Sequence, residues 1–379
     1  MVAALPVILV SSLLLLLAAP PLPALATFLA PLAPKLTLAV KALNGGLSLY
    51  VAFGCAQSLA RRRGIDPVGP AVSAAAALLL SAVKPDGGIP LDRLNQTGLF
   101  AGLLFGLASA ELSAFAERRR LTLRLPDGVP PAIVRSFAAL LPGAALLIGA
   151  LLLRLLDADL LAATDLLARP LVAVAGSFGG VILICLCDAG FYYFGVHPAG
   201  VLAALQPLWL SMLTENQAAR LAGRALPHLA TREFFLWFVW QGGSGGTLAL
   251  LLCLLFARAT SLKTTARLAL VPAIFNINEP LLFGLPIVLN PTLLVPFLLG
   301  PIVSASVAYF AFSLSLVPRP VYEVLWTLPA PVGAFLACGS LRAVALELTT
   351  LTLTTMLWWP FVRHLDRARL SAEGAAASL

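Results

Sequence analysis

The segment FNINEPLLFGLPIVLNP, residues 275–291, places one carboxylate and three asparagines inside an otherwise apolar stretch. An ionisable side chain at membrane depth costs at least about 2.5 kcal/mol on insertion-based scales, so Glu279 is first interpreted as functional. The alternative is a carboxylate that caps a helix or pairs with an arginine. Asn276 and Asn278 supply amide donors and acceptors together, which suits the recognition of sugar hydroxyls.

Three prolines punctuate the same segment, at Pro280, Pro286 and Pro291. Each proline removes a backbone donor and disfavours helix at the residue before it, so the chain should break or turn at Glu279 and Asn290. Irregular backbone at membrane depth is tolerated where protein buries it or where it lines a watery cavity. We therefore expect a re-entrant hairpin here.

A second polar island is FYYFGVHPAG, residues 191–200, where His197 lies in an aromatic, apolar stretch. A histidine beside a proline can be a turn residue, or its neutral imidazole can exchange hydrogen bonds with a hydroxyl group. The residues alone leave both interpretations open. Asp188, nine residues earlier, is expected at the end of a membrane span.

Two further segments interrupt the apolar runs. VWQGGSGGTL, which begins at Val239, has four glycines, and no Lys-Ser/Thr pair follows them, so a packing or substrate-facing break is preferred over a phosphate cradle. Trp326 lies in the proline-rich segment WTLPAPVGAFL. Trp is enriched both in interfacial belts and at sugar-stacking sites, and both remain open for it.

The composition of the whole chain is that of an integral membrane protein. Hydrophobic residues make up 60% of the 379 positions and charged residues 11%, whereas a soluble domain carries about 25% charged residues. Several apolar runs approach the roughly 20 residues that a bilayer requires. The net charge of +8 comes from short basic clusters between these runs, which indicates membrane topology and not a nucleic-acid partner.

The distribution of charge predicts the orientation. Basic triplets, Arg61–Arg63 and Arg118–Arg120, follow the second and fourth apolar runs, and an acidic stretch at 157–165 falls on the opposite side. Loops rich in Lys and Arg stay in the cytoplasm. We therefore predict a multi-pass protein of the cytoplasmic (inner) membrane, with both its amino terminus and its basic tail, 363–369, in the cytoplasm.

A change in pattern near residue 169 predicts two parts. Residues 1–168 contain clean apolar runs and are expected to form a scaffold of about five spans. In residues 169–379 the runs are interrupted by Gly, Pro, Asn, Glu and His, so this half should hold the solute. The stretch 214–231 is expected to be an amphipathic surface helix.

Three classes of function fit such a chain. They are a component of a sugar-transport system, an ion-coupled secondary transporter with broken helices, and a membrane enzyme acting on a lipid-linked sugar. The third usually requires an acidic pair or a metal site, and the sequence has no Asp-x-Asp or clustered histidines. The five cysteines are interpreted as buried small hydrophobes, so neither a metal nor a cofactor is expected.

FNINEPLLFGLPIVLNP, VWQGGSGGTL and the stretches at 125–143 and 209–219 together resemble one family. It is Enzyme IIC, the membrane component of the bacterial phosphoenolpyruvate-dependent sugar phosphotransferase system, in its lactose, cellobiose and diacetylchitobiose branch. The resemblance runs from about residue 5 to residue 369. It implies an all-α polytopic homodimer with about ten transmembrane helices and two re-entrant hairpins, whose amino-terminal half forms the dimer.

The resemblance also implies a sugar pocket in the carboxyl-terminal half. By position, Asn278 and the glycines Gly242 and Gly243 would line it, with Asn276 beside them, and Trp326 would face a sugar ring. The implied substrate is a disaccharide of the cellobiose, diacetylchitobiose or lactose type.

The implied chemistry joins Glu279 and His197 at the 6-hydroxyl of the sugar. The phosphoryl group would come from a cysteine of a separate soluble Enzyme IIB, so this chain would not transfer phosphate on its own. Enzyme IIB would dock on basic cytoplasmic loops and on LPDGVPP, residues 125–131. Alternating access would present the sugar to the phosphocysteine, and Glu279 would orient the hydroxyl as a general base does.

Overall fold

The chain folds into two compact units. Unit 1 comprises Met1–Ala18 and Ala30–Leu171, and unit 2 comprises Ala19–Leu29 and Val172–Leu379. The computed structural model describes residues 5–20, 23–83, 87–89, 91, 93–121, 123, 137–285 and 287–377. The docking segment expected at 125–131 lies outside the described residues.

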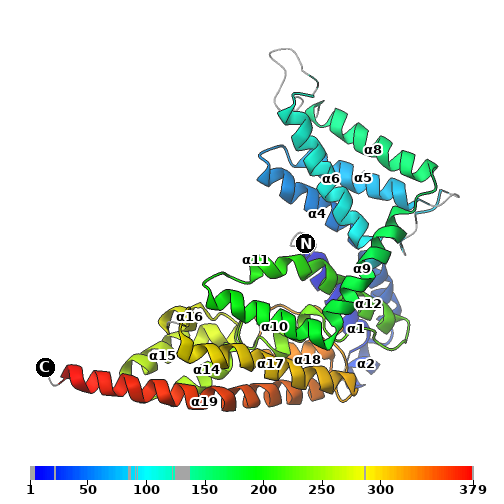
Figure 1. The fold of residues 1–379 in the computed structure, drawn as a ribbon. Helices are drawn as coiled ribbons and strands as arrows, with labels where there is room; N and C mark the ends of the chain where they lie inside the picture. The colour runs from blue at the N-terminus through cyan, green and yellow to red at the C-terminus, as the bar shows by residue number, and fades with distance from the viewer. Residues whose placement is uncertain are drawn as a thin grey trace. The chain divides into compact units, whose positions relative to one another are not determined.

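Unit 1 is a set of helices with no strand among its described residues (Figure 1). Its elements are α1 (Leu5–Ala18), α3 (Ala33–Gly45), α4 (Leu47–Arg62), α5 (Val68–Ala82), the 3-10 turn η2 (Gln96–Gly98), α6 (Leu99–Arg118), α8 (Leu140–Leu155) and α9 (Leu160–Gly176), which continues into unit 2.

Small side chains hold unit 1 together. Helices α4, α5, α6 and α8 pack on one another around fully buried alanines such as Ala52, Ala56 and Ala74. A Cβ added at Gly102 would lie 2.6 Å from the Ser48 carbonyl oxygen. Small residues let the backbones of membrane helices approach closely, and close packing is what stabilises helix pairs in lipid.

Unit 2 is also helical but its helices are shorter and more often interrupted. Its elements are α2 (Pro23–Leu29), α10 (Phe178–Tyr193), α11 (Ala199–Leu202), η3 (Ala203–Leu205), α12 (Gln206–Leu221), α13 (Arg232–Phe238), α14 (Thr247–Leu254), α15 (Thr260–Ile274), α16 (Glu279–Gly284), α17 (Pro291–Ser313), α18 (Ala330–Cys338) and α19 (Leu341–Ala377).

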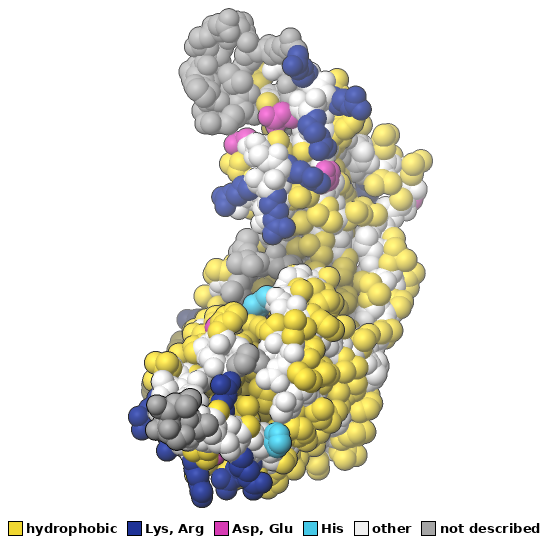
Figure 2. Space-filling model, turned by 60° about the vertical axis from the view of Figure 1, so that its left-hand side comes forward, with side chains coloured by type: hydrophobic (Ala, Val, Ile, Leu, Met, Phe, Trp, Pro, Cys, Tyr) yellow, Lys and Arg dark blue, Asp and Glu magenta, His cyan; other side chains and the backbone are white. Residues whose placement is uncertain are grey.

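Several helices are long and apolar enough to cross a membrane. Gln96–Arg118 and α17 each have 23 residues, which corresponds to about 35 Å of helix. The bent pairs α3 with α4 and α9 with α10 also qualify if each pair is one span, which brings the described total to four. Hydrophobic side chains cover much of the visible surface (Figure 2). The prediction of an all-α polytopic membrane protein is confirmed.

The expected break in segment 275–291 is present. Helix α15 ends at Ile274, Asn276 has a left-handed φ of 63°, and the short α16 begins at Glu279. Asn290 caps α17, and its side-chain oxygen accepts a hydrogen bond from the Thr292 amide at 3.0 Å. The prolines therefore interrupt helix at both positions where the sequence predicted a break.

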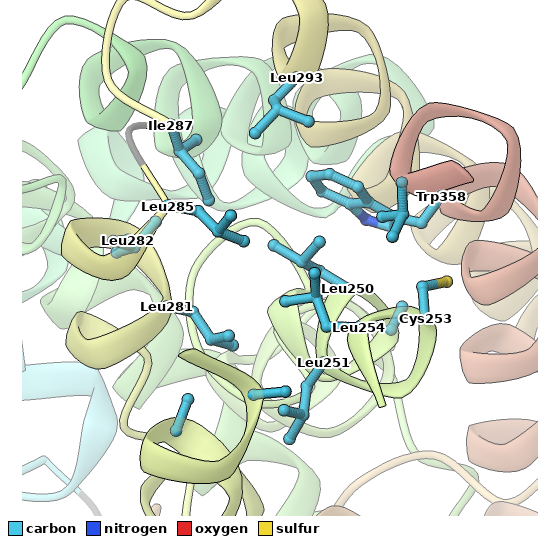
Figure 3. Close-up of a cluster of buried hydrophobic side chains, with 14 of the residues drawn as sticks. Leu250, Leu251, Cys253, Leu254, Leu281, Leu282, Leu285, Ile287, Leu293 and Trp358 are labelled. Carbon is cyan, nitrogen blue, oxygen red and sulfur yellow. The ribbon is translucent and has the colours of Figure 1, made fainter. Parts of the chain in front are cut away.

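An apolar core supports this broken segment. Leu281 of α16 points toward Leu250 and Leu254 of α14, and Leu282 of α16 and Trp358 of α19 belong to the same cluster of buried side chains (Figure 3). All of these side chains are buried. The short helix α16 is therefore anchored by its apolar face, while its first residue, Glu279, is exposed.

The prediction of an amphipathic surface helix at 214–231 is wrong. Residues up to Leu221 continue α12, and residues 222–231 are not helical. Asn216 is fully buried, and its amide nitrogen donates to the carbonyls of His228 at 2.7 Å and Pro320 at 2.8 Å. The polar residues of this stretch are thus internal hydrogen-bonding groups and not a solvated face, which periodicity alone cannot distinguish.

Candidate functional site

The glycine-rich segment folds as a tight turn between α13 and α14. Gly242, Gly243, Gly245 and Gly246 have φ values of 76°, 109°, 80° and 65°. This left-handed region suits glycine because it has no Cβ. A Cβ added at Gly243 would lie 2.6 Å from Cγ of Asn278. The glycines therefore allow the turn to form and let it contact the segment 276–279.

Two asparagines join the turn to the break after α15. The Gly242 amide donates to Oδ1 of Asn276 at 2.9 Å, and Nδ2 of Asn278 donates to the Ser244 carbonyl at 2.9 Å. Both asparagine side chains are buried. Each bond replaces a backbone partner that a broken helix leaves unmet, as burial in lipid requires.

Asn276 also holds the segment that carries Trp326. Its Nδ2 donates to the carbonyls of Trp326 at 2.7 Å and Leu328 at 2.9 Å. Both of its N–H donors are therefore used, and Oδ1 keeps one lone pair beyond its bond to Gly242. Bracing three segments is the role that these contacts give Asn276, and its direct contact with a sugar remains a prediction.

Buried and partly buried charged side chains of α13 also contact the segment 321–329. Glu233 is fully buried, accepts a hydrogen bond from Nε1 of Trp237 at 2.5 Å and is also bonded by the Val324 backbone. The Nη1 atom of Arg232 lies 3.4 Å from Oε1 of Glu323. Trp326 itself is 43% exposed, in a segment whose backbone is bonded by the buried side chains of Asn276 and Glu233.

Tyr192 packs against His197 and lies within electrostatic range of Glu279. The ring centroids of Tyr192 and His197 are 5.1 Å apart, and Glu279 is close enough to interact electrostatically with the Tyr192 hydroxyl. Tyr192 is buried, whereas His197 and Glu279 are exposed. One ring contact and one electrostatic interaction thus relate Tyr192 to two residues that are 82 positions apart in sequence.

Asp188 does not lie at a span end, and that prediction is wrong. It lies within α10, one helical turn before Tyr192, with 1% of its surface exposed. Its carboxylate accepts hydrogen bonds from the Gly245 amide at 3.2 Å and from the Ser244 side chain. The missed signal was its spacing from Tyr192, since residues four apart share a helix face.

Gln241 forms a further buried connection, from the turn to α19. Its Nε2 donates to the Glu347 carbonyl and to Oγ1 of Thr350, both at 2.9 Å. Gln241, Glu347 and Thr350 are all buried. Apolar periodicity does not indicate this pairing, because 106 residues separate Gln241 from Glu347.

These contacts define the candidate site in unit 2. Backbone and amide groups fix the glycine turn, the 276–279 break and the Trp326 segment to one another. A carboxylate, an imidazole and an indole are exposed at its edge: Glu279, His197 and Trp326. Such a set can exchange hydrogen bonds with hydroxyl groups and stack on the apolar face of a sugar ring.

A cavity of about 620 Å³ lies in unit 1, lined by α5 and α8. Its walls are apolar except at Asp66 and Ser73, and it offers neither an amide side chain nor a histidine. It is less suited to a polyhydroxylated solute than the groups of unit 2.

Comparison with known proteins gives one family. The family model described as "Phosphotransferase system, EIIC" matches residues 1–301. The lichenan permease IIC component of Bacillus subtilis (strain 168) is 34% identical over 97% of this chain and 88% of the relative. The cellobiose-specific EIIC component of Geobacillus stearothermophilus is 33% identical over 90% of this chain and 81% of the relative.

A solved structure agrees with these relatives. The transporter ChbC, the IIC component of the N,N'-diacetylchitobiose-specific phosphotransferase system, matches with a TM-score of 0.93 and 31% identity, over 98% of this chain and 93% of that chain. The resemblance inferred from sequence motifs is confirmed, and so is its consequence that the protein resides in a membrane. The chain belongs to the EIIC family, the membrane permease components of the sugar phosphotransferase system.

Proposed function

We propose that this permease imports a disaccharide of the cellobiose, diacetylchitobiose or lactose type and presents its 6-hydroxyl to a phosphocysteine of a separate EIIB protein. The observation that carries the proposal is the braced break at 276–279, where Glu279 is exposed beside a glycine turn. The names of the cellobiose and diacetylchitobiose relatives support the substrate class.

Each site residue has a defined part in this proposal. Asn278, Gly242 and Gly243 line the sugar pocket, with Asn276 as their brace. Trp326 stacks on a sugar ring, because an exposed indole on a rigid segment offers a flat apolar face.

The reaction takes place between the sugar and EIIB. The oxygen of the 6-hydroxyl attacks phosphorus, the S–P bond of the phosphocysteine breaks, and a new O–P bond forms. Glu279 orients the hydroxyl and accepts its proton, while His197 holds the same hydroxyl by a hydrogen bond. This chain supplies position and a base, and EIIB supplies the phosphoryl group.

The supporting arrangement is a homodimer formed through residues 1–168, with residues 169–379 as the moving, sugar-holding half. Both termini lie in the cytoplasm, so the EIIB protein reaches the sugar from that side. Alternating access requires that the sugar-holding half move as a body, and the hydrogen bonds that join Asn276 to the glycine turn and to the Trp326 segment support such rigidity.

The test uses inside-out membrane vesicles that contain the permease. Purified EIIB, with its phosphoryl donors, is added with radiolabelled cellobiose, lactose or diacetylchitobiose, and sugar phosphate is separated from free sugar. We expect phosphorylation of at least one disaccharide that requires both the permease and EIIB. Accumulation of free sugar in right-side-out vesicles without EIIB would contradict the proposal and favour an ion-coupled transporter.

A further inference from the structure

A basic surface lies where the start of α15 meets the end of α19. Figure 2 shows lysine and arginine side chains gathered near the carboxyl-terminal end of the chain. The surface has six cations: Arg258, Lys263, Arg267, Arg363, Arg367 and Arg369. Five of these side chains are exposed and Arg363 is half-buried. Within the described part of the chain, none of the six forms an ion pair.

The two nearby carboxylates are engaged elsewhere. Asp366 accepts hydrogen bonds at 2.8 Å from the amides of residues 258 and 259, and Glu373 accepts at 2.9 and 3.0 Å from the amides of residues 260 and 261. Both carboxylates therefore face the amino-terminal end of α15, where negative charge is favourable. These four bonds also hold the two helices together and give the surface a fixed shape.

The depth of this surface follows from its neighbours. On α19, Met356 is 65% exposed and Trp359 is 37% exposed, one turn before Arg363. The Arg363 guanidinium lies 4.8 Å from the Trp359 ring centroid. On α15, Leu268 directly follows Arg267 and is 71% exposed. Each helix thus has cations next to exposed apolar residues, the pattern of a membrane–water interface.

We propose that this basic surface binds the phosphate groups of anionic phospholipids. Six cations on two joined helices, flanking carboxylates that are already engaged, form a concentrated positive charge at headgroup height. Basic clusters beside membrane helices attract anionic lipid in this way. The proposal concerns the bilayer around unit 2 and does not depend on the sugar site.

The experiment measures thermal unfolding of the purified protein in a neutral detergent. Dioctanoyl phosphatidylglycerol is titrated, with dioctanoyl phosphatidylcholine and inorganic phosphate as separate arms. Phosphatidylglycerol alone should raise Tm, and the rise should fall with added salt. The variant R267Q/R367Q/R369Q should lose at least half of that rise. The matched control, R118Q/R119Q/R120Q, changes three exposed arginines of unit 1 and should keep the full rise.

A charge-preserving variant separates binding from folding. R267K/R367K/R369K should respond to phosphatidylglycerol as the wild type does, and native mass spectrometry should count fewer retained lipids on the glutamine variant only. An equal rise in Tm for the glutamine variant would overturn the proposal. So would an equal rise with inorganic phosphate, or a glutamine variant whose only defect is a higher KM for EIIB, since the surface would then bind the partner protein.

Discussion

The two units bury different kinds of residue. In unit 1 the buried polar side chains among the described residues are hydroxyls, such as Ser48 and Ser109, and its charged contacts lie at the surface, as between Arg63 and Glu111. Unit 2 buries carboxylates and amides, among them Asp188, Glu233, Glu347, Asn216, Gln241, Asn276 and Asn278.

This difference fits the roles proposed for the two units, a scaffold and a site. Regular helices satisfy their own backbone, so unit 1 needs little more than close packing of alanine and glycine. Unit 2 contains broken helices, and its buried side chains replace the missing backbone partners. The same groups that make the break possible hold the segment in which Glu279 lies, so under the proposed function recognition and stability share residues in unit 2.

The largest effect should come from Glu279→Gln. The amide keeps the size of the side chain but cannot accept the hydroxyl proton, so sugar phosphorylation by EIIB should fall at least about 100-fold. The measurement is initial rate in vesicles with equal amounts of permease. Retained wild-type turnover would remove the base from the mechanism. Loss of folded protein would be visible by size-exclusion chromatography and would call for Glu279→Asp instead.

The glycine turn gives the next largest effect. In Gly243→Ala the added Cβ meets Asn278 at 2.6 Å with φ at 109°, and such backbone strain costs about 1–3 kcal/mol. We expect at least a tenfold loss of phosphorylation rate. Gly200→Ala is the matched control, because a Cβ there meets nothing within 4 Å, and it should behave as the wild type. Equal behaviour of the two variants would contradict the tight contact.

Asp188→Asn tests whether buried polar groups of unit 2 act on the site. The substitution keeps an acceptor for the Gly245 amide but adds amide donors in a buried position, where an unpaired donor costs about 1–3 kcal/mol, and we expect KM for the sugar to rise severalfold. Ser109→Ala is the counterpart in unit 1, where the hydroxyl donates to the Pro70 carbonyl at 2.7 Å. It should lower Tm and leave KM unchanged. A similar change in KM for both would erase the contrast between the units.

The smallest effect concerns the bonds between α15 and α19. Hydrogen bonds from the Ser261 and Thr260 amides hold the pKa of Glu373 below its ordinary value of 4.5. A lowered pKa in the folded state means that the carboxylate stabilises the fold above pH 4.5 and that this contribution is lost as pH falls through the lowered value. Glu373→Gln should therefore lower Tm slightly near neutral pH, and the difference from wild type should shrink in acid. A difference that grows in acid would contradict the assignment.

Sequence reasoning reached the fold and part of the site. Composition predicted a helical membrane protein, and the prolines of segment 275–291 predicted the breaks before α16 and before α17. It failed for Asp188 and for the stretch 214–231, because both carry polar residues whose partners are distant in sequence. Asn216, for example, bonds Pro320 across 104 residues. Apolar periodicity describes one helix at a time and cannot report such pairings.

The same limit applies to the roles of individual site residues, since these roles also depend on partners distant in sequence. Asn276 was interpreted as a group for sugar hydroxyls, and the structure shows its amide nitrogen donating to two backbone carbonyls. Residue type gives the hydrogen-bonding capacity of an asparagine but not the partner that uses it. The roles of Glu279, His197 and Trp326 toward a sugar remain predictions for the experiments above.

A structure of the permease with a bound disaccharide tests the central claim most directly. The account predicts sugar density in unit 2 against Gly242, Gly243 and Asn278, with the 6-hydroxyl about 3 Å from the Glu279 carboxylate. Density in the apolar cavity between α5 and α8, or a 6-hydroxyl that faces away from Glu279, would contradict it.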